Sequence, residues 1–368
     1  MDRREFIKTA SAGAIALGMP STSFAKKKVE KPGVIKNKLP RWRGFNLLPF
    51  FRPISYDGFD PWPIEGMNDY LKWIEDWGFD FVRVPMSYHY YIHHNWYGKN
   101  PVTPEEAISF NEEAIEPIEK FVYLAMEHHL HVSLCLHRAP GFCINKECIE
   151  EPYDLWTDEA AQQALCAHWD MWAKRFKDVS PKQLSFDLVN ESYTKDFDTY
   201  RKIVADCLQA IRRYNPERIV ISDSIFSSPI SNIEDLDVAQ SCRGYNPGKL
   251  THFRNPWGGN IHDKVFPTWT KDDRQKLEKY YQPWVELKNR GIGVHCGECG
   301  CYNKTPHDVF LAWMTDVLDI LTENDIGWAL WNFRGSFGLI DSGRQDVNYK
   351  NFHGHKLDKE LLKLLQSH

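Results

Sequence analysis

The sequence predicts one α/β domain folded as a closed barrel of eight parallel strands with helices between them, a (β/α)8 barrel with long aromatic loops. Apolar strand-like runs alternate with helix-period segments from residue 41 to residue 368. A chain of 368 residues, 42% of them hydrophobic, is long enough for one such barrel and its core. An open doubly wound sheet is the alternative fold. It is disfavoured because RGFNLLPFFRP, which includes the first strand, contains no glycine-rich phosphate loop.

Eight apolar runs are predicted as the strands of the barrel. They cover residues 43–50, 79–86, 131–138, 183–191, 218–224, 238–245, 292–298 and 326–333. Helices are predicted over residues 67–78, 111–130, 160–178, 197–216, 272–291, 307–325 and 356–365, where apolar residues recur at helical spacing. Gly78 and the pair Asn215-Pro216 are typical helix stop signals. Residues 86–110 and 245–270 are long and aromatic, so we expect them to be insertions at the carboxyl ends of the strands.

The N-terminus predicts an export signal over residues 1–25. It carries the pair Arg3-Arg4, a short and weakly apolar run, and the small-residue site Ser23-Phe24-Ala25. Paired arginines before such a run are typical of a twin-arginine signal, which is an address and not part of the fold. We expect cleavage after Ala25, a flexible basic linker over residues 26–40, and the barrel domain over 41–368. The protein would then be periplasmic or extracellular.

Composition limits the classes of partner. The formal net charge is −5 and no long basic or acidic tail is present, which argues against nucleic-acid binding. The apolar run near the N-terminus is too short for a stable membrane span. Aromatic residues make up 14% of the chain, including 14 Trp and 16 Tyr. They favour either a carbohydrate-binding cleft, because flat amphipathic rings suit sugars, or a Trp-rich core. The oligomeric state is not predicted.

Polar and aromatic residues stand at the predicted ends of six strands. In a parallel barrel such residues meet at one mouth. They are Arg83, His137, Asn190 with Glu191, Tyr245, Glu298 and Trp331. Any one of them has a structural explanation, such as an ion pair or core packing, but their joint placement indicates one binding site.

The pair Glu191 and Glu298 predicts the chemistry of that site. Two carboxyl groups facing one mouth suit glycoside hydrolysis, where one protonates the leaving oxygen and the other attacks the sugar carbon. The acid must stay protonated while the nucleophile stays ionised. Arg83 is expected to keep Glu298 ionised, which makes Glu298 the nucleophile and Glu191 the acid. Asn190 is expected to bind a sugar 2-hydroxyl.

These motifs resemble glycoside hydrolase family 5, the cellulase-like family of retaining barrel enzymes. The resemblance rests on VRVP, LHRAPG, SFDLVNES, the glutamate after the seventh strand and WALWNF, and it spans residues 41 to 366. It implies that Glu191 is the acid/base and Glu298 the nucleophile. It also implies a sugar subsite lined by Arg83, His137, Asn190, Tyr245 and Trp331. The expected substrate is a β-linked glucan, mannan or related glycoside, with no cofactor and no metal.

The sequence departs from the family pattern at two positions. Arg243 stands where the family usually has a histidine, two residues before Tyr245, and Ser192 stands where proline is common. Arg243 is counted among the substrate-binding candidates. Its fixed positive charge could bind an anionic or substituted sugar, or it could pair with a nearby acid.

Two other classes of protein remain open at this point. One is a non-catalytic carbohydrate-binding barrel. The other is a thiol or metal redox protein centred on Cys296, Cys299 and Cys301 in GVHCGECGCYN. Strand alternation would place Cys296 on the inner face with Glu298, so three converging thiolates are not expected. Cys143 and Cys148 lie in one predicted loop, where a disulfide is an option in an oxidising compartment.

Polar residues in the loops leave two further questions open. His89, His93 and His94 could bind a metal, but no ligand spacing recurs among them. Arg334, Asp341 and Arg344 could contact outer sugars or simply staple a loop.

Overall fold

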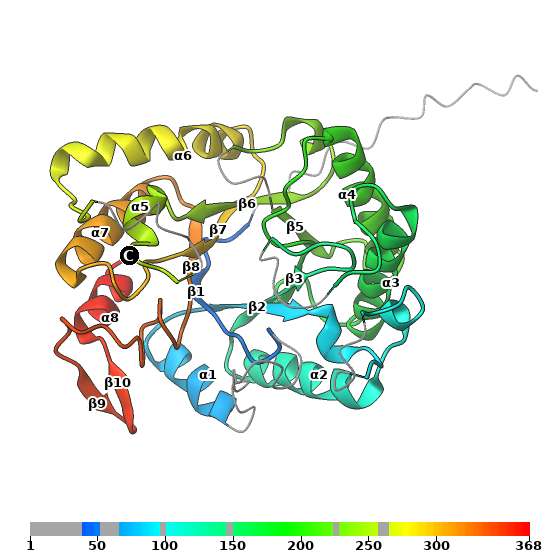
Figure 1. The fold of residues 1–368 in the computed structure, drawn as a ribbon, viewed down its shortest axis with the longest axis horizontal. Coiled ribbons are helices and arrows are strands. Elements are labelled where there is room, and N and C mark those ends of the chain that lie inside the picture. Colours follow the sequence, from blue (N-terminus) through cyan, green and yellow to red (C-terminus); the bar gives the residue numbers. More distant parts are fainter. Residues whose placement is uncertain (1–38, 52–65, 96–100, 145–149, 224–227, 257–264) are drawn as a thin grey trace, which may run out of the picture. The chain divides into compact units, whose positions relative to one another are not determined.

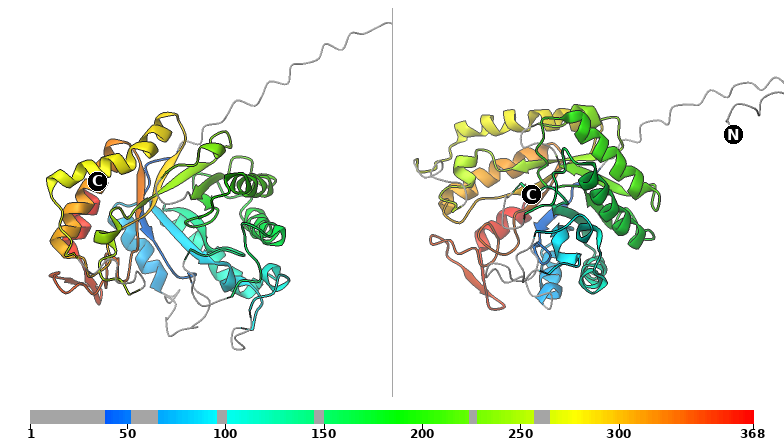
Figure 2. Two further views of the ribbon diagram at one scale, coloured as in Figure 1. Left: turned by 45° about the horizontal axis from the view of Figure 1, so that its top comes forward. Right: turned by 45° about the vertical axis from the view of Figure 1, so that its right-hand side comes forward.

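The chain folds as a closed parallel barrel. The computed structural model describes residues 39–51, 66–95, 101–144, 150–223, 228–256 and 265–368, which fall within one compact unit, residues 34–368. Eight strands pair in chain order, and the last pairs with the first. Every pairing is parallel. The predicted (β/α)8 barrel is confirmed, and Figures 1 and 2 show the strands as an inner ring surrounded by helices.

The elements follow each other in the predicted order. The barrel strands are β1 Arg43–Asn46, β2 Phe81–Ser87, β3 His131–Arg138, β4 Leu184–Asp187, β5 Ile219–Asp223, β6 Ala239–Gly244, β7 Val294–Cys299 and β8 Gly327–Leu330. The helices are α1 Met67–Asp76, α2 Glu112–Glu127, α3 Glu159–Arg175, α4 Phe197–Arg212, α5 Gly248–Thr251, α6 Arg274–Asn289, α7 His307–Glu323 and α8 Lys359–Gln366. Short 3-10 helices span Tyr88–Tyr91, Glu106–Ile108, Ser231–Ile233 and Lys271–Asp273.

Helix α4 illustrates why these segments fold locally as they do. The Asp196 side chain accepts hydrogen bonds from the backbone amides of Asp198 and Thr199, so it caps the first turn. The buried residues then recur at helical spacing, as in Val204, Leu208 and Ile211. This apolar stripe packs the helix against the barrel, between β4 and β5 in the chain.

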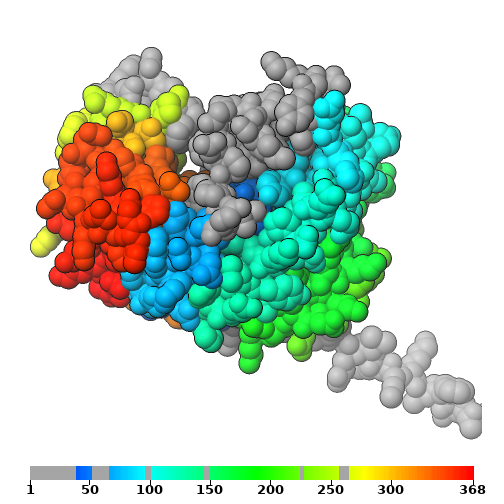
Figure 3. All heavy atoms as spheres, turned by 90° about the horizontal axis from the view of Figure 1, so that it is seen from below, coloured from blue at the N-terminus to red at the C-terminus, as the bar shows by residue number. Residues whose placement is uncertain are grey.

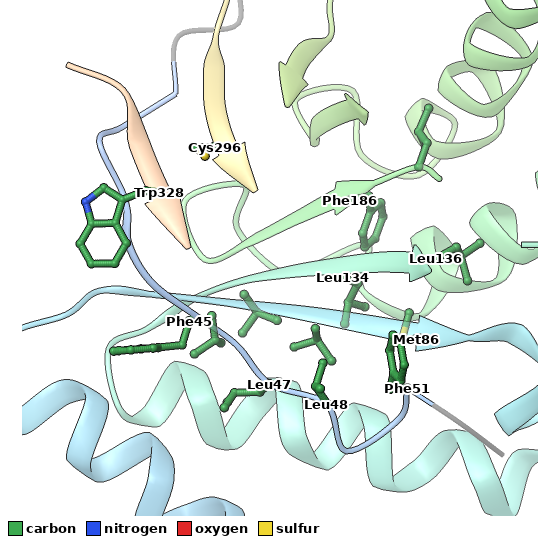
Figure 4. Packing of buried hydrophobic residues seen from close by; sticks show 14 of the residues in the cluster. Phe45, Leu47, Leu48, Phe51, Met86, Leu134, Leu136, Phe186, Cys296 and Trp328 are labelled. Carbon is green, nitrogen blue, oxygen red and sulfur yellow. The ribbon is translucent and has the colours of Figure 1, made fainter. Parts of the chain in front are cut away.

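Strand alternation separates the two faces of the barrel. In β3, HVSLCLHR, the apolar residues Val132, Leu134 and Leu136 belong to the main core between strands and helices, and the residues between them are polar or small. Figure 4 shows Leu134 with Leu47 and Leu48 in this layer. A second, smaller apolar cluster holds Leu39, Trp42, Phe81, Ile221, Ala239 and Ala329. Because it includes the first residues of β2 and β6, it closes the barrel interior at the amino ends of the strands.

Much of the tryptophan content is structural. Trp169, Trp172, Trp284, Trp313 and Trp328 are among the largest fully buried side chains. The Trp-rich core is therefore real, and aromatic composition by itself was not evidence for a cleft. Each such side chain contributes several kcal/mol, since truncating a buried aromatic to alanine typically costs about 3–5 kcal/mol.

Between β5 and β6 the described residues form only the 3-10 helix Ser231–Ile233, and no helix was predicted there. Several strand ends differ from the sequence-based expectation. Strand β1 ends at Asn46, not at residue 50. Strand β4 ends at Asp187, not at residue 191, although the amides of Leu188 and Asn190 still donate to β5 and β3. Strand β8 ends at Leu330, so Trp331 lies just beyond it.

The C-terminal segment contains a hairpin that periodicity did not predict. Strands β9 Lys350–Phe352 and β10 His355–Leu357 pair antiparallel, and α8 begins only after Asp358, whose side chain accepts from the Leu361 amide. The expected helix from residue 356 was therefore wrong at its start. Figure 3 shows this C-terminal region in red beside the blue of α1, and Gln366 donates to the Trp77 carbonyl oxygen at 3.1 Å.

No helix among the described residues is both long enough and apolar enough to cross a membrane.

Candidate active site

Glu298 is held by hydrogen-bond donors from two other strands. Arg83 in β2 donates from Nη1 to Glu298 Oε1 at 2.8 Å. The hydroxyl of Tyr245, just after β6, donates to Oε2 at 2.9 Å. Arg243 Nη2 lies 3.6 Å from Oε1. Glu298 is 3% exposed, so these charges and dipoles replace water in stabilising its carboxylate.

Glu191 is held differently. Its only charged hydrogen-bond partner among the described residues is Arg243, whose Nε lies 3.2 Å from Oε1. Its side chain is 15% exposed, so it is the more open of the two glutamates. Burial and the negative charge of Glu298 raise the pKa of Glu191 to about 7, and Arg243 opposes this rise.

Asn190 links the two arginines through its side-chain oxygen. Its Oδ1 accepts from Arg83 Nη2 at 2.8 Å and from Arg243 Nη2 at 2.9 Å. Arginine can only donate, so the orientation of the amide is determined by these contacts. The amide nitrogen Nδ2 is buried and has no hydrogen-bond partner among the described residues. Asn190 therefore presents a fixed donor group at the site.

A cluster of aromatic rings lies at the carboxyl ends of β3 and β8. His137, at the end of β3, stacks on Trp331 with ring centroids 5.6 Å apart and an interplanar angle of 25°. Phe51 packs edge-on against both rings. His137 is buried and Trp331 is partly exposed.

Burial and the nearby negative charge of Glu298 raise the pKa of the Tyr245 hydroxyl well above its usual value, so it remains a donor.

Six of the eight residues expected at the site form one network of hydrogen bonds: Arg83, Asn190, Glu191, Arg243, Tyr245 and Glu298. The other two, His137 and Trp331, form a stacked pair at the ends of β3 and β8. Arg243 is the departure from the family pattern, and the structure shows what it contacts. It is 3% exposed, and Nη2 forms an ion pair with Asp223. Nη1 donates to Ser241 Oγ at 2.9 Å. The cation is thus already paired with an acid, the second of the two options that the sequence left open.

Sequence reasoning missed three buried polar residues of the same network. Asn46 in β1 accepts from Arg83 Nη1 at 3.1 Å and donates to the Gly297 carbonyl oxygen at 2.9 Å. Asp187 in β4 accepts from Arg83 Nε at 2.9 Å. Asp223 in β5 pairs with Arg243. The available signal was their place near the ends of the first, fourth and fifth strands. It was missed because the ends of the first and fifth strands were not considered, and because residues 46 and 187 were placed inside longer predicted strands.

The alternation assumed for the seventh strand was wrong. The pairing of β6 with β7 shifts register, with Cys242 opposite Cys296 but Arg243 opposite Glu298, so Gly297 is the extra residue of a β-bulge. Cys296 consequently faces the helical layer, where its thiol contacts Cys242, Cys299 and Tyr281 of α6. It is not a lining residue of the site beside Glu298, as expected. Cys299 is also buried, with its thiol 3.5 Å from the Ala329 carbonyl oxygen.

The cysteine-centred alternative finds no metal site in the described residues. No group of three or more His, Cys, Asp or Glu side chains in those residues is arranged to hold a metal ion. The thiols of Cys296 and Cys299 do converge, and Cys242 is the third thiol in contact with Cys296. Cys301 is buried too, and its carbonyl oxygen accepts from Arg344 at 2.6 Å. Cys148, half of the possible disulfide, lies outside the described residues.

The loop residues with two possible roles are engaged in the protein itself. His89 lies 3.2 Å from Glu151 and His94 lies 3.0 Å from Glu106. Arg334 pairs with Asp341 at 3.1 Å. Arg344 is buried and donates to backbone oxygens of residues 301 and 305. The contacts of Arg334, Asp341 and Arg344 thus stabilise the loop after β8, which is the structural role of the two that were considered.

Comparisons with known proteins agree with the geometry. Residues 37–336 match the model of the cellulase family, glycosyl hydrolase family 5. Endoglucanase C of Acetivibrio thermocellus is 23% identical over 344 residues, which cover 83% of this chain and 95% of that protein. Cellodextrinase A of Ruminococcus flavefaciens is 24% identical over 272 residues, which cover 70% of this chain and 75% of that protein.

Solved structures include equally extensive matches. A glycoside hydrolase crystal structure aligns with a TM-score of 0.79 at 33% identity, covering 89% of this chain and 99% of the other. The endoglucanase Cel5A of Thermotoga maritima has the same fold, with a TM-score of 0.69 at 20% identity over 88% of this chain and 96% of its own. With its barrel, its paired glutamates and a family match over residues 37–336, this chain is a glycoside hydrolase and belongs to glycosyl hydrolase family 5, the cellulase family.

Proposed function

We propose that this protein is an exported retaining β-glycoside hydrolase that acts by double displacement on a β-linked glucan, mannan or related oligosaccharide. Glu191 is the acid/base and Glu298 the nucleophile. The observation that carries this assignment is the different electrostatic environment of the two carboxyls. Arg83 and Tyr245 donate to Glu298, whereas burial raises the pKa of Glu191 to about 7.

The first step forms a covalent intermediate. The Glu298 carboxylate attacks the anomeric carbon, the bond from that carbon to the leaving oxygen breaks, and Glu191 gives its proton to that oxygen. The sugar is then an ester of Glu298, and Glu191 is ionised.

The second step restores the enzyme. Ionised Glu191 takes a proton from a water molecule as that water attacks the anomeric carbon, and the bond to Glu298 breaks. Two inversions leave the configuration unchanged. The raised pKa of Glu191 suits this exchange, because a group that titrates near neutral pH can both give and take a proton there.

Three further groups support sugar binding at the same place. Asn190 presents its Nδ2 donor, which has no partner among the described residues and suits a sugar 2-hydroxyl. Trp331, stacked on His137, offers a partly exposed ring of the kind that packs on sugar faces. Because Arg243 is paired with Asp223, it supports a neutral sugar and not an anionic one. The names of the relatives, endoglucanase and cellodextrinase, favour a β-glucan.

Export is proposed from residues 1–25, which lie outside the described residues. The twin-arginine pattern supports it.

The decisive experiment compares the wild type with Glu298→Gln and Glu191→Gln on a panel of β-glucan and β-mannan oligosaccharides. Loss of the nucleophile should lower kcat by about four orders of magnitude or more. Loss of the acid should cost about 10²- to 10⁴-fold, and less with an activated leaving group that needs no proton. Glu323→Gln, which alters an exposed glutamate on α7, is the matched control and should keep wild-type activity.

A mechanism-based label tests the retaining step separately. A 2-deoxy-2-fluoro glycoside with a good leaving group should accumulate as an ester, and peptide mass spectrometry should locate it on Glu298. A label on any other residue, or equal turnover by the Glu298→Gln variant, would overturn the assignment. Calorimetric binding without products across the panel would support the non-catalytic barrel in its place.

A further inference from the structure

Asp223 is a buried carboxylate at the end of β5 that the double-displacement mechanism does not use. It is 1% exposed. Its Oδ2 accepts from the backbone amide of Glu191 at 2.7 Å and from Arg243 Nη2. Its Oδ1 has no hydrogen-bond partner among the described residues. A single oxygen atom therefore joins the backbone of one glutamate to the guanidinium that contacts its side chain.

The backbone at Glu191 needs such support. Its φ of +47° is in the left-handed region, which is unfavourable for a residue with a side chain. The hydrogen bond that the Glu191 amide donates to Asp223 Oδ2 holds this turn in place. This turn sets the direction in which the Glu191 carboxyl points. Asp223 is itself anchored from outside the barrel, because the Tyr200 hydroxyl of α4 donates to its carbonyl oxygen at 2.5 Å.

The same side chain balances the charge of Arg243. Burial raises the pKa of Asp223 to about 8, the Arg243 cation opposes this rise, and the close contact with Nη2 favours the ionised carboxyl. The guanidinium Nε contacts Glu191, and Nη2 contacts Asp223 and Asn190 Oδ1. If Asp223 were neutral, the anions left within 4 Å of Arg243 would be Glu191 and Glu298. A histidine, the usual residue here, carries no permanent charge and would need no such counter-ion. Arg243 and Asp223 thus form a unit that replaces it.

We propose that Asp223 is a positioning residue for this reaction: it holds the Glu191 backbone turn and draws the Arg243 guanidinium away from the Glu191 carboxyl, so that Glu191 can serve as the acid. The inference rests on the proposed function of Glu191 and deepens it. It assigns a role to a residue that does not itself touch the substrate.

The charges around Glu191 show that Asp223 acts through Arg243. The titratable and charged groups that face the Glu191 carboxyl come from five elements of the fold: Arg83 of β2, Asp223 of β5, Arg243 of β6 with Tyr245 after it, Tyr280 of α6 and Glu298 of β7. Burial has the largest effect on the pKa of Glu191, and among the charges Glu298 comes first, then Arg243 and then Arg83. Removing Asp223 frees Arg243 for Glu191, and the released cation favours the ionised acid.

The test uses Asp223→Asn and Arg243→Gln in the full-length protein. Asparagine can still accept the Glu191 amide hydrogen bond, so this variant removes the charge of Asp223 and little else. The Asp223→Asn change should lower the pKa of Glu191 by about one unit, the usual order of a neighbouring-charge effect. Arg243→Gln should move it in the opposite direction. If Asp223 only supported the fold, the pKa of Glu191 would not move in opposite directions in the two variants.

The primary readout is independent of activity. Glu191 is observed by NMR titration of ¹³C-labelled glutamate carboxyls and assigned by its absence in Glu191→Gln. In parallel, the basic limb of kcat/KM should move to lower pH in Asp223→Asn and to higher pH in Arg243→Gln. If no glycoside is hydrolysed, the proposed function fails while the NMR titration still decides the role of Asp223.

Asp187→Asn is the matched control. It also neutralises a buried carboxylate of the network, but Asp187 pairs with Arg83 at 2.9 Å. Its effect on the Glu191 titration should be clearly smaller than that of Asp223→Asn. An unchanged Glu191 titration in a folded Asp223→Asn, or equal shifts in the two aspartate variants, would overturn the proposal. If Asp223→Asn does not fold, Arg243→Gln decides alone, and a wild-type titration there would overturn it.

Discussion

At the scale of single residues, the site is a compact network of buried charges. Two arginines face four carboxyl groups: Arg83 and Arg243 with Asp187, Glu191, Asp223 and Glu298. An apolar layer of similar volume would usually be at least as stable, because desolvating ions costs more than pairing them returns. The network is therefore explained by chemistry and not by stability. An excess of carboxyls over cations also favours a bound proton, and Glu191, whose side chain is the most accessible of the four, is the member that can exchange it.

The pH dependence of the wild type follows from the raised pKa of Glu191. The protonated acid predominates below about pH 7 and is lost as the pH rises through that value. We expect kcat/KM to fall along a basic limb centred near pH 7. The measurement is a kcat/KM profile from about pH 4 to about pH 9, with an activated aryl glycoside as control because its cleavage needs little proton donation. A basic limb near the ordinary glutamate value would contradict the assignment.

The same shift has a defined sign for stability. A carboxyl whose pKa is higher in the folded protein than in the unfolded chain favours folding in its protonated form. That contribution is complete below the ordinary glutamate pKa and is lost as the pH rises through about 7. Thermal unfolding of the wild type should reflect this loss, and Glu191→Gln should show less of it.

At the scale of elements, the β-bulge in β7 decides which side chains enter the barrel. A regular strand would place Cys296 and Glu298 on one face. With the bulge at Gly297, the side chains of Cys242 and Cys296 face α6, while Arg243 and Glu298 face the site. A single inserted residue therefore places the Cys296 thiol on the opposite face of the strand from Glu298. No local pattern in GVHCGEC predicts this bulge.

Gly297 is predicted to tolerate no side chain. A Cβ there would lie 2.6 Å from Ser241 Oγ and 3.0 Å from Arg243 Nη1. The Gly297→Ala variant should therefore displace Arg243, lower kcat by about tenfold or more, and destabilise the fold by about 1–3 kcal/mol. Steady-state kinetics and thermal unfolding measure these two effects.

Gly66→Ala is the control for that substitution. A Cβ at Gly66 would meet nothing within 4 Å, and its φ of −85° suits alanine. Activity and stability should stay close to wild type. Wild-type kinetics in Gly297→Ala would show that the bulge does not hold Arg243 in place.

At the scale of the whole molecule, closure of the barrel brings together residues that are far apart in sequence. Asn46 of β1 reaches Gly297 of β7 and Leu330 of β8. On the other side of β1, Gly44 permits the close approach of β2, because a Cβ there would lie 1.7 Å from the Phe81 carbonyl oxygen. Strand order and closure place six strand ends around one pair of glutamates, and this shared mouth is what a barrel contributes to function.

Export is the prediction that belongs to the whole chain. Changing Arg3 and Arg4 to lysine should retain the protein in the cytoplasm, because the twin-arginine pathway reads that pair. Cell fractionation with immunoblotting measures the distribution, and N-terminal sequencing of the exported form should begin at Lys26. Export of the Lys-Lys variant at the wild-type level would rule out this signal.

The sequence by itself determined the barrel, its strand order and the eight candidate site residues, because periodicity and strand-end position are local properties. The hairpin β9–β10 was not visible in that way. Glu191 was predicted as a candidate from its place after the fourth strand, but its left-handed turn was not foreseen, since the fourth strand was predicted to run through it.

Only the tertiary structure decided how the site residues are paired. Arg243 could have met a substrate anion or a protein acid, and Asp223, 20 residues away on the neighbouring strand, turned out to be the acid. The bulge at Gly297 and the contacts of Asn46 also depend on how distant strands pair in the closed barrel. The physical reason is that a buried charge takes whichever counter-ion the closed barrel brings within reach, and strand register, not local sequence, determines which one that is.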